Sequence, residues 1–195
     1  THGAPEMVNA HPHMDCEGRV AVIHNGVIEN FMELKEELLQ KGHNFTSRTD
    51  TEIIAHLIEE EMKEDVEMGE AILRALRNLE GSYALGIVSS TDPERIYIAR
   101  NESPIVLGVS EQGTFCASDV PALLPYTNQV IYLRSGEFAV MDEDGFQIKN
   151  IQDGTPVVRE LQEITWTLEM AEKQGYPHFM LKEIYEQPVS MRNAL

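Results

Sequence analysis

The sequence predicts an α+β fold in which antiparallel sheets are covered by helices. Between residues 29 and 80, apolar side chains recur with the period of amphipathic helices. From Ser82 to Asn150 this period gives way to short β-rich runs separated by turn signals, the spacing expected of antiparallel strands. Several runs, such as Val130-Ile-Tyr-Leu133, are apolar on both alternating faces, which indicates sheets buried between layers.

Composition bounds the possible functions. The chain has 195 residues, 42% of them hydrophobic, and a formal net charge of -18. This negative charge argues against nucleic acid or an anionic membrane as a partner. No apolar run approaches the roughly 20 residues that span a bilayer. Two cysteines are too few for a disulfide framework, so we expect a cytoplasmic protein.

The first 18 residues show no sustained period and are expected to be irregular. His11-Pro12-His13 raises the question of a metal site, because imidazole is a common metal ligand. A proline separates the two histidines and no matching cysteine or carboxylate cluster accompanies them, so a structural loop is favoured. We expect no metal and no other cofactor.

The stretch from Val20 to Asn30 organises the rest of the chain. Val20 to Ile23 form a short apolar run typical of a buried strand, Asn25-Gly26 is a turn signal, and a helical period begins at Glu29. A strand, a corner and a helix are therefore predicted. An amide side chain and a backbone N–H at such a corner can donate two hydrogen bonds to a developing oxyanion. Spacing alone favours the simpler interpretation, a turn that tolerates positive φ.

Three helices are predicted next. The first spans residues 29–41 and ends at Gly42, a residue suited to a helix C-terminus. The second begins in the stretch Thr49-Asp-Thr-Glu52, where Thr49 and Glu52 have the spacing of a capping box, and it runs to about Lys63. The third runs from about Met68 to Gly81.

The strand region contains seven predicted strands. A short helical turn, residues 118–124, is expected among them, and Cys116 is expected to pack in the core. After Asn150 the pattern fades, and residues 169–175 read as a polar connector. The predicted strands are Tyr83–Ser89, Arg95–Arg100, Ile105–Val109, Thr114–Ala117, Gln129–Leu133, Glu137–Met141 and Phe146–Lys149.

Four motifs, in order, resemble those of class II glutamine amidotransferase domains: Thr1-His2-Gly3, Asn9-Ala-His-Pro-His13, His24-Asn-Gly-Val-Ile-Glu-Asn30 and Thr49-Asp-Thr-Glu52. The resemblance covers nearly the whole chain. It implies the N-terminal-nucleophile hydrolase fold, a four-layer α/β/β/α sandwich of antiparallel sheets.

The closing stretch Met180-Leu-Lys-Glu-Ile-Tyr-Glu-Gln-Pro188 resembles the junction that leads into the sugar-isomerase half of glutamine:fructose-6-phosphate aminotransferases. This implies a glutamine amidotransferase domain at 1–165 and a connector with the start of the junction at 166–195. It also implies a C-terminal sugar-isomerase domain in the same chain, a homodimer, and ammonia production for glucosamine 6-phosphate synthesis.

The resemblance also assigns roles to individual positions. The Asn25 side chain and the Gly26 N–H would form the oxyanion hole. Asp50, with the Gly26 carbonyl, would bind the glutamine α-ammonium, while Thr1 and His2 would bind the α-carboxylate. A helix cap at Asp50 and a frayed end at Thr1 and His2 are the structural alternatives.

The family's nucleophile departs from what this sequence contains. It is a cysteine at the mature N-terminus, upstream of the Thr-His-Gly motif, and neither Cys16 nor Cys116 matches it. We therefore expect a fragment of a longer protein that does not hydrolyse glutamine alone. The alternatives are a threonine hydrolase using Thr1, a non-catalytic glutamine- or partner-binding module, and another class II enzyme such as amidophosphoribosyltransferase or asparagine synthetase.

Overall fold

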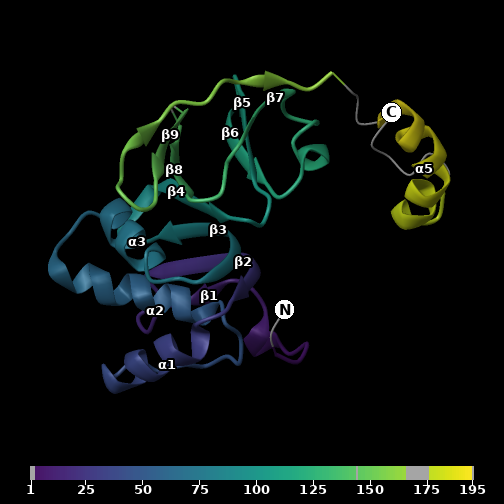
Figure 1. Cartoon of the computed structure of the whole chain (residues 1–195). Helices are drawn as coiled ribbons and strands as arrows, with labels where there is room; N and C mark the ends of the chain where they lie inside the picture. Colours follow the sequence, from purple (N-terminus) through teal and green to yellow (C-terminus); the bar gives the residue numbers. More distant parts are fainter. Residues whose placement is uncertain (1–2, 144, 166–175, 195) are drawn as a thin grey trace.

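Two antiparallel sheets form the centre of the computed structural model, which describes residues 3–143, 145–165 and 176–194 (Figure 1). Strand order in the larger sheet is β1-β2-β3-β4-β8-β9-β10, and in the smaller sheet it is β11-β7-β5-β6. The larger sheet comprises β1 (His13–Met14), β2 (Val20–Ile28), β3 (Gly81–Ser89), β4 (Asp92–Asn101), β8 (Glu137–Asp142), β9 (Gly145–Asn150) and β10 (Pro156–Val157). The smaller sheet comprises β5 (Val106–Ser110), β6 (Gly113–Ala117), β7 (Gln129–Tyr132) and β11 (Gln162–Glu163).

The helices lie mostly in the first half of the chain. Three of them, α1, α2 and α3, cover one face of the larger sheet (Figure 1). The helical segments are η1 (Met7–Asn9), α1 (Phe31–Gln40), α2 (Glu52–Glu61), η2 (Met62–Glu64), α3 (Met68–Leu76), η3 (Val120–Ala122) and α5 (Phe179–Ala194). None of the helices in the described ranges is long and apolar enough to cross a membrane.

Strand alternation divides the core into layers. On β3, Leu85 packs with the helices whereas Ala84 faces the smaller sheet, because successive side chains of a strand point to opposite faces. A third cluster, which includes Val106 and Val120, lies on the outer face of the smaller sheet beside η3. The predicted α+β sandwich is therefore confirmed, and in the described residues η3 and its flanking loop form the thin fourth layer.

All seven predicted strands are present, with ends shifted by at most three residues. The predicted helical turn is η3, and the first helix ends next to Gly42, whose φ of 94° suits that position. Two short strands after Asn150, β10 and β11, had no recognisable pattern. The predicted connector, residues 169–175, lies outside the described residues.

The predicted corner at Asn25-Gly26 is wrong. Strand β2 continues through both residues to Ile28, pairing with β3 from Val20 opposite Ser89 to Ile28 opposite Gly81. Gly26 has a φ of 137°, and a Cβ there would lie 2.0 Å from the carbonyl oxygen of Ser82. The glycine therefore permits close backbone approach inside the sheet, a demand that sequence alone does not reveal.

Two predicted helix ends and one predicted core residue also need correction. Thr49 does not cap α2; the Glu52 carboxylate instead accepts hydrogen bonds from the backbone N–H groups of Thr46 and Ser47, both at 2.7 Å. Helix α3 ends at Leu76, and Gly81 opens β3, although the side chain of Leu79 stays in the apolar stripe. Cys116 lies in β6 as predicted, but it is exposed.

Candidate active site

Strand β2 and the turn before α2 meet at a cavity of about 360 Å³. We call it the Asn25 cavity. Its lining brings together residues from three separate stretches of the chain, all of them within the resembling motifs. They are Asn9, Ala10, His11, His24, Asn25, Gly26, Thr49, Asp50 and Thr51.

Asp50 is fixed against the strand that carries Asn25 and Gly26. Its side chain is almost fully buried, and Oδ2 accepts a hydrogen bond of 2.8 Å from the backbone N–H of Ile28. Ile28 lies two residues beyond Gly26, a separation of roughly 6.6–6.8 Å along a strand. One small amino acid can therefore reach both the carboxylate and the Asn25-Gly26 pair.

Asn25 and His24 point to opposite sides of β2, because neighbouring strand residues alternate. Asn25 is exposed and His24 is buried beneath the strand. Asn25, His24 and His11 also line a second, mostly apolar cavity of about 280 Å³ that reaches Ile105 and Cys116. Asn25 thus borders both cavities, and its exposed side-chain amide is accessible to a ligand.

A hydrogen-bonded chain supports the strand from below. His24 Nδ1 lies 3.1 Å from Thr51 Oγ1 and His24 Nε2 lies 3.4 Å from the carbonyl oxygen of Ser82. The carbonyl can only accept, so Nε2 carries the proton and Thr51 donates to Nδ1. Burial lowers the pKa of His24, an effect that nearby Asp50 only partly opposes, so this imidazole is neutral at pH 7.

The turn before α2 is held by charge-assisted hydrogen bonds. Besides the two backbone donors, Glu52 accepts from the hydroxyls of Ser47 and Thr46 at 2.6 and 2.9 Å. Burial would raise the pKa of Glu52, but the nearby His56 imidazole and the hydrogen bonds from Ser47 and Thr46 outweigh it and hold the pKa well below its usual range. The ionised Glu52 therefore fixes the segment that presents Asp50.

The structure brings together three of the five predicted site residues, Asn25, Gly26 and Asp50, in one cavity. Thr1 and His2 lie outside the described residues. The supporting residues His24 and Thr51 belong to the motifs, but the resemblance assigns them no role. The alternation of side chains along β2 indicates that His24 is buried with Val20 and Val22. It does not indicate that Thr51 is the hydrogen-bond partner of His24.

The layered sheets and this cavity define a class: the N-terminal-nucleophile hydrolase fold of class II amidotransferases. Among solved structures, a glutamine phosphoribosylpyrophosphate amidotransferase from B. subtilis superposes with a TM-score of 0.64, covering 78% of this chain and 34% of that chain at 24% identity. A glutamine aminotransferase class-II domain protein from Silicibacter pomeroyi superposes at 0.53, covering 74% of this chain and 71% of that chain at 18% identity. At these identities the likeness concerns the fold.

Residues 6–125 match the family model of the glutamine amidotransferase domain. The chain belongs to this family. It is 57% identical, over its whole length, to the glutamine–fructose-6-phosphate aminotransferase of Thermococcus kodakarensis and 52% identical to that of Pyrococcus horikoshii. The chain spans about a third of the length of these relatives, covering 32% and 33% of them.

Proposed function

We propose that the Asn25 cavity binds L-glutamine and stabilises the transition state for hydrolysis of its side-chain amide. The chain would be the glutaminase part of a glutamine:fructose-6-phosphate aminotransferase. The observation that supports this best is the joint placement of Asn25, Gly26 and Asp50 around one cavity, with Asp50 anchored to the same strand.

The chemistry assigned to these residues begins with binding. The Asp50 carboxylate attracts the α-ammonium group of glutamine, and the two methylenes of the substrate then reach along β2 toward Asn25. Binding the head group in one place orients the amide carbonyl, which lowers the entropic part of the barrier. Thr1 and His2 are proposed to hold the α-carboxylate, as the family resemblance implies.

The reaction itself places negative charge on the amide oxygen. Attack by a thiolate forms a tetrahedral intermediate, and the Asn25 side-chain amide and Gly26 N–H would donate hydrogen bonds to its oxyanion. Collapse breaks the C–N bond as the departing nitrogen takes up the proton that the thiol had given to its base, which releases ammonia; water then hydrolyses the glutamyl thioester to glutamate and returns the thiol. On the family resemblance, the thiolate is a cysteine outside these residues; the Cys16 side chain instead faces His43 and His56.

The acceptor and the setting are also proposals. Identity to the relatives named above supports fructose 6-phosphate as acceptor and a C-terminal sugar-isomerase domain as partner. Residues 1–165 would form the amidotransferase domain and 166–195 the connector and junction. We further propose a homodimer in the cytoplasm.

The full-length gene product tests this function through glutamate release from L-glutamine. Asn25→Ala should lower kcat by roughly 10²- to 10³-fold with a small change in KM, because an oxyanion donor acts mainly in the transition state. Asn128→Ala, at an exposed hydrogen bond with Glu163, is the matched control and should keep wild-type rates. Unchanged kcat in Asn25→Ala would remove Asn25 from the proposed mechanism.

A further inference from the structure

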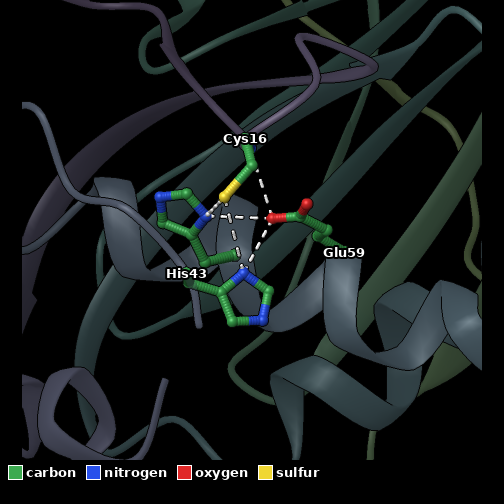
Figure 2. Close-up of side chains that lie close together, drawn as sticks. Cys16, His43 and Glu59 are labelled. Carbon is green, nitrogen blue, oxygen red and sulfur yellow. Dashed lines mark hydrogen bonds and ion pairs between the residues drawn. The ribbon is translucent and has the colours of Figure 1, made fainter. Parts of the chain in front are cut away.

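A second polar cluster lies on the far side of the turn that presents Asp50. Cys16 follows β1, His43 follows α1, and His56 and Glu59 are on one face of α2. One ligand atom from each residue, a sulfur, two Nδ1 nitrogens and a carboxylate oxygen, lies within 4.8 Å of every other. Figure 2 shows the side chains of Cys16, His43 and Glu59 turned toward a common centre. We call these four residues the Cys16 cluster.

The distances from Cys16 to the two imidazoles are near those of tetrahedral coordination. Zinc bonds of about 2.3 Å to sulfur and 2.0–2.1 Å to nitrogen place these two ligand atoms about 3.5–3.6 Å apart. Cys16 Sγ lies 3.8 Å from His43 Nδ1 and 3.6 Å from His56 Nδ1. Glu59 Oε2 lies 2.8 and 3.0 Å from the same nitrogens, against about 3.3–3.4 Å expected for an oxygen ligand. Ligation would require shifts of about half an ångström at the Glu59 contacts and would draw together any ligand atoms that lie farther apart, up to 4.8 Å.

A second carboxylate lies behind each imidazole of the Cys16 cluster. His43 Nε2 lies 2.8 Å from Glu60 Oε2, and His56 Nε2 faces Glu52 Oε1 at 3.7 Å. A carboxylate behind a ring accepts a hydrogen bond from Nε2–H and so leaves the Nδ1 lone pair for a metal, which is the usual outer shell of metal-binding histidines. Within the described part of the chain, His56 Nε2 is buried without a hydrogen-bond partner, so inward movement of Glu52 would complete this shell.

Hydrogen bonds alone satisfy the cluster poorly. Both Nδ1 atoms face the same acceptor, Glu59 Oε2, which also accepts from the Cys16 N–H at 3.2 Å. If both rings donate, His43 must carry a proton on each nitrogen, because its Nε2 faces the Glu60 carboxylate, while His56 keeps a buried Nε2 without a partner in the described residues; both side chains are almost fully buried. A divalent ion at the four ligand atoms would let both rings be neutral, with each Nδ1 lone pair on the ion and each Nε2–H turned toward an outer carboxylate.

We propose that Cys16, His43, His56 and Glu59 bind one divalent transition-metal ion, preferably zinc. The mixture of sulfur, imidazole and carboxylate ligands suits zinc and disfavours magnesium or calcium, which prefer oxygen alone. Four protein ligands leave no open position, so the site is structural. On binding, the Cys16 thiol releases its proton to solvent and becomes the thiolate ligand.

Such an ion would join three separate segments of the chain. The loop after β1 and the loop after α1 would both be fixed to α2, the helix that begins two residues after Asp50. The exposed position of Cys16 gives the ion a route from solvent. The proposal replaces the expectation of no metal, and His11 and His13 take no part in the site.

Metal analysis of the purified full-length protein tests the site directly. After dialysis without chelator, mass spectrometry should find about one zinc ion per chain, and Cys16→Ser should bind zinc at least about 100-fold more weakly in competition with a chromophoric chelator. Cys116→Ser is the matched thiol control and should bind like the wild type. Glu60→Gln, which removes the charge behind His43 but none of the four ligands, should weaken binding by about 10- to 100-fold.

Cobalt(II) provides a readout that does not depend on how well a variant folds. Wild-type protein loaded with cobalt should show the near-ultraviolet charge-transfer absorption of a cobalt–thiolate bond, and Cys116→Ser should keep it. The proposal is overturned if the wild type binds neither zinc nor cobalt at micromolar concentration, or if Cys16→Ser binds zinc as tightly as the wild type. Neither result depends on whether the Asn25 cavity hydrolyses glutamine.

Discussion

The two polar regions beside α2 differ in what their side chains face. In the Asn25 cavity, Asn25, Gly26 and Asp50 border a space of about 360 Å³. In the Cys16 cluster, four ligand atoms lie within 4.8 Å of one another. Polar groups that line a cavity large enough for a small molecule are suited to binding a substrate. Polar groups that contact one another are suited to a structural role. The segment from His43 to Glu52 separates the two regions and is tied to both.

The largest effect is expected at the floor of the Asn25 cavity. Gly26→Ala would place a Cβ 2.0 Å from the Ser82 carbonyl oxygen, so β3 must move and the oxyanion donor moves with it. We expect the free energy of unfolding to fall by about 3 kcal/mol or more, and we expect glutaminase activity to be lost as well. Urea denaturation and glutamate release measure both.

Gly113 provides a control with the same backbone demand and no collision. Its φ is 128°, and a Cβ there meets nothing within 4 Å. Gly113→Ala should therefore cost only the conformational strain, about 1–2 kcal/mol, and leave activity intact. Equal losses in the two variants would mean that close approach to Ser82 is unimportant.

A smaller effect is expected from neutralising Asp50. Asp50→Asn keeps an oxygen for the Ile28 N–H but removes the charge opposite the α-ammonium of glutamine. We expect kcat/KM to fall by about 10- to 100-fold, mainly because KM rises. This factor corresponds to the free energy of one hydrogen bond to a charged group. Steady-state kinetics of Asp50→Asn beside Asp119→Asn, a residue that caps η3, would reveal whether the loss is specific.

The turn between the two regions should be less sensitive. Glu52→Gln weakens hydrogen bonds from the N–H groups of Thr46 and Ser47, and we expect a loss of about 1–2 kcal/mol in the free energy of unfolding. Glu61→Gln, at a partly exposed ion pair on the same helix, should change it by less than about 0.5 kcal/mol. Denaturation in the presence of a chelator separates this effect from any bound metal.

The smallest effect concerns pH. Burial lowers the pKa of His24 below the ordinary value of 6.5, so at acid pH the unfolded chain binds a proton that the folded chain resists. Stability from a neutral His24 is present above pH 6.5 and is lost as the pH falls below it. The stability advantage of the wild type over His24→Gln should shrink over that range; a constant difference from pH 7.5 to about 5.5 would show that His24 is not held neutral.

The sequence predicted the strands better than the turns. Alternating apolar runs such as Gln129–Tyr132 depend on local pattern, and all seven were found. The path through Asn25-Gly26 depends instead on the partner strand β3, which no local pattern contains. Likewise, Glu52 was assigned to a helix cap because its spacing fits, yet its carboxylate reaches the loop at Thr46 and Ser47.

The Asn25 cavity could be predicted from the sequence and the Cys16 cluster could not, because the cluster depends on contacts between segments that are distant in the chain. Asn25, Gly26 and Asp50 stand in motifs that resemble those of a known family, so their meeting could be expected. Within the Cys16 cluster only His56 and Glu59 share a helical period, and Cys16 and His43 come from separate loops. Their convergence follows from packing of the helix layer on β1 and β2.

A crystal structure of the full-length protein with bound L-glutamate tests the assignment of the Asn25 cavity most directly. We expect the product's side-chain carboxylate within hydrogen-bond distance of the Asn25 amide and the Gly26 N–H, with its α-ammonium on Asp50. Glutamate bound elsewhere, with no contact to Asp50 either directly or through one bridging water, would contradict the proposed glutamine site.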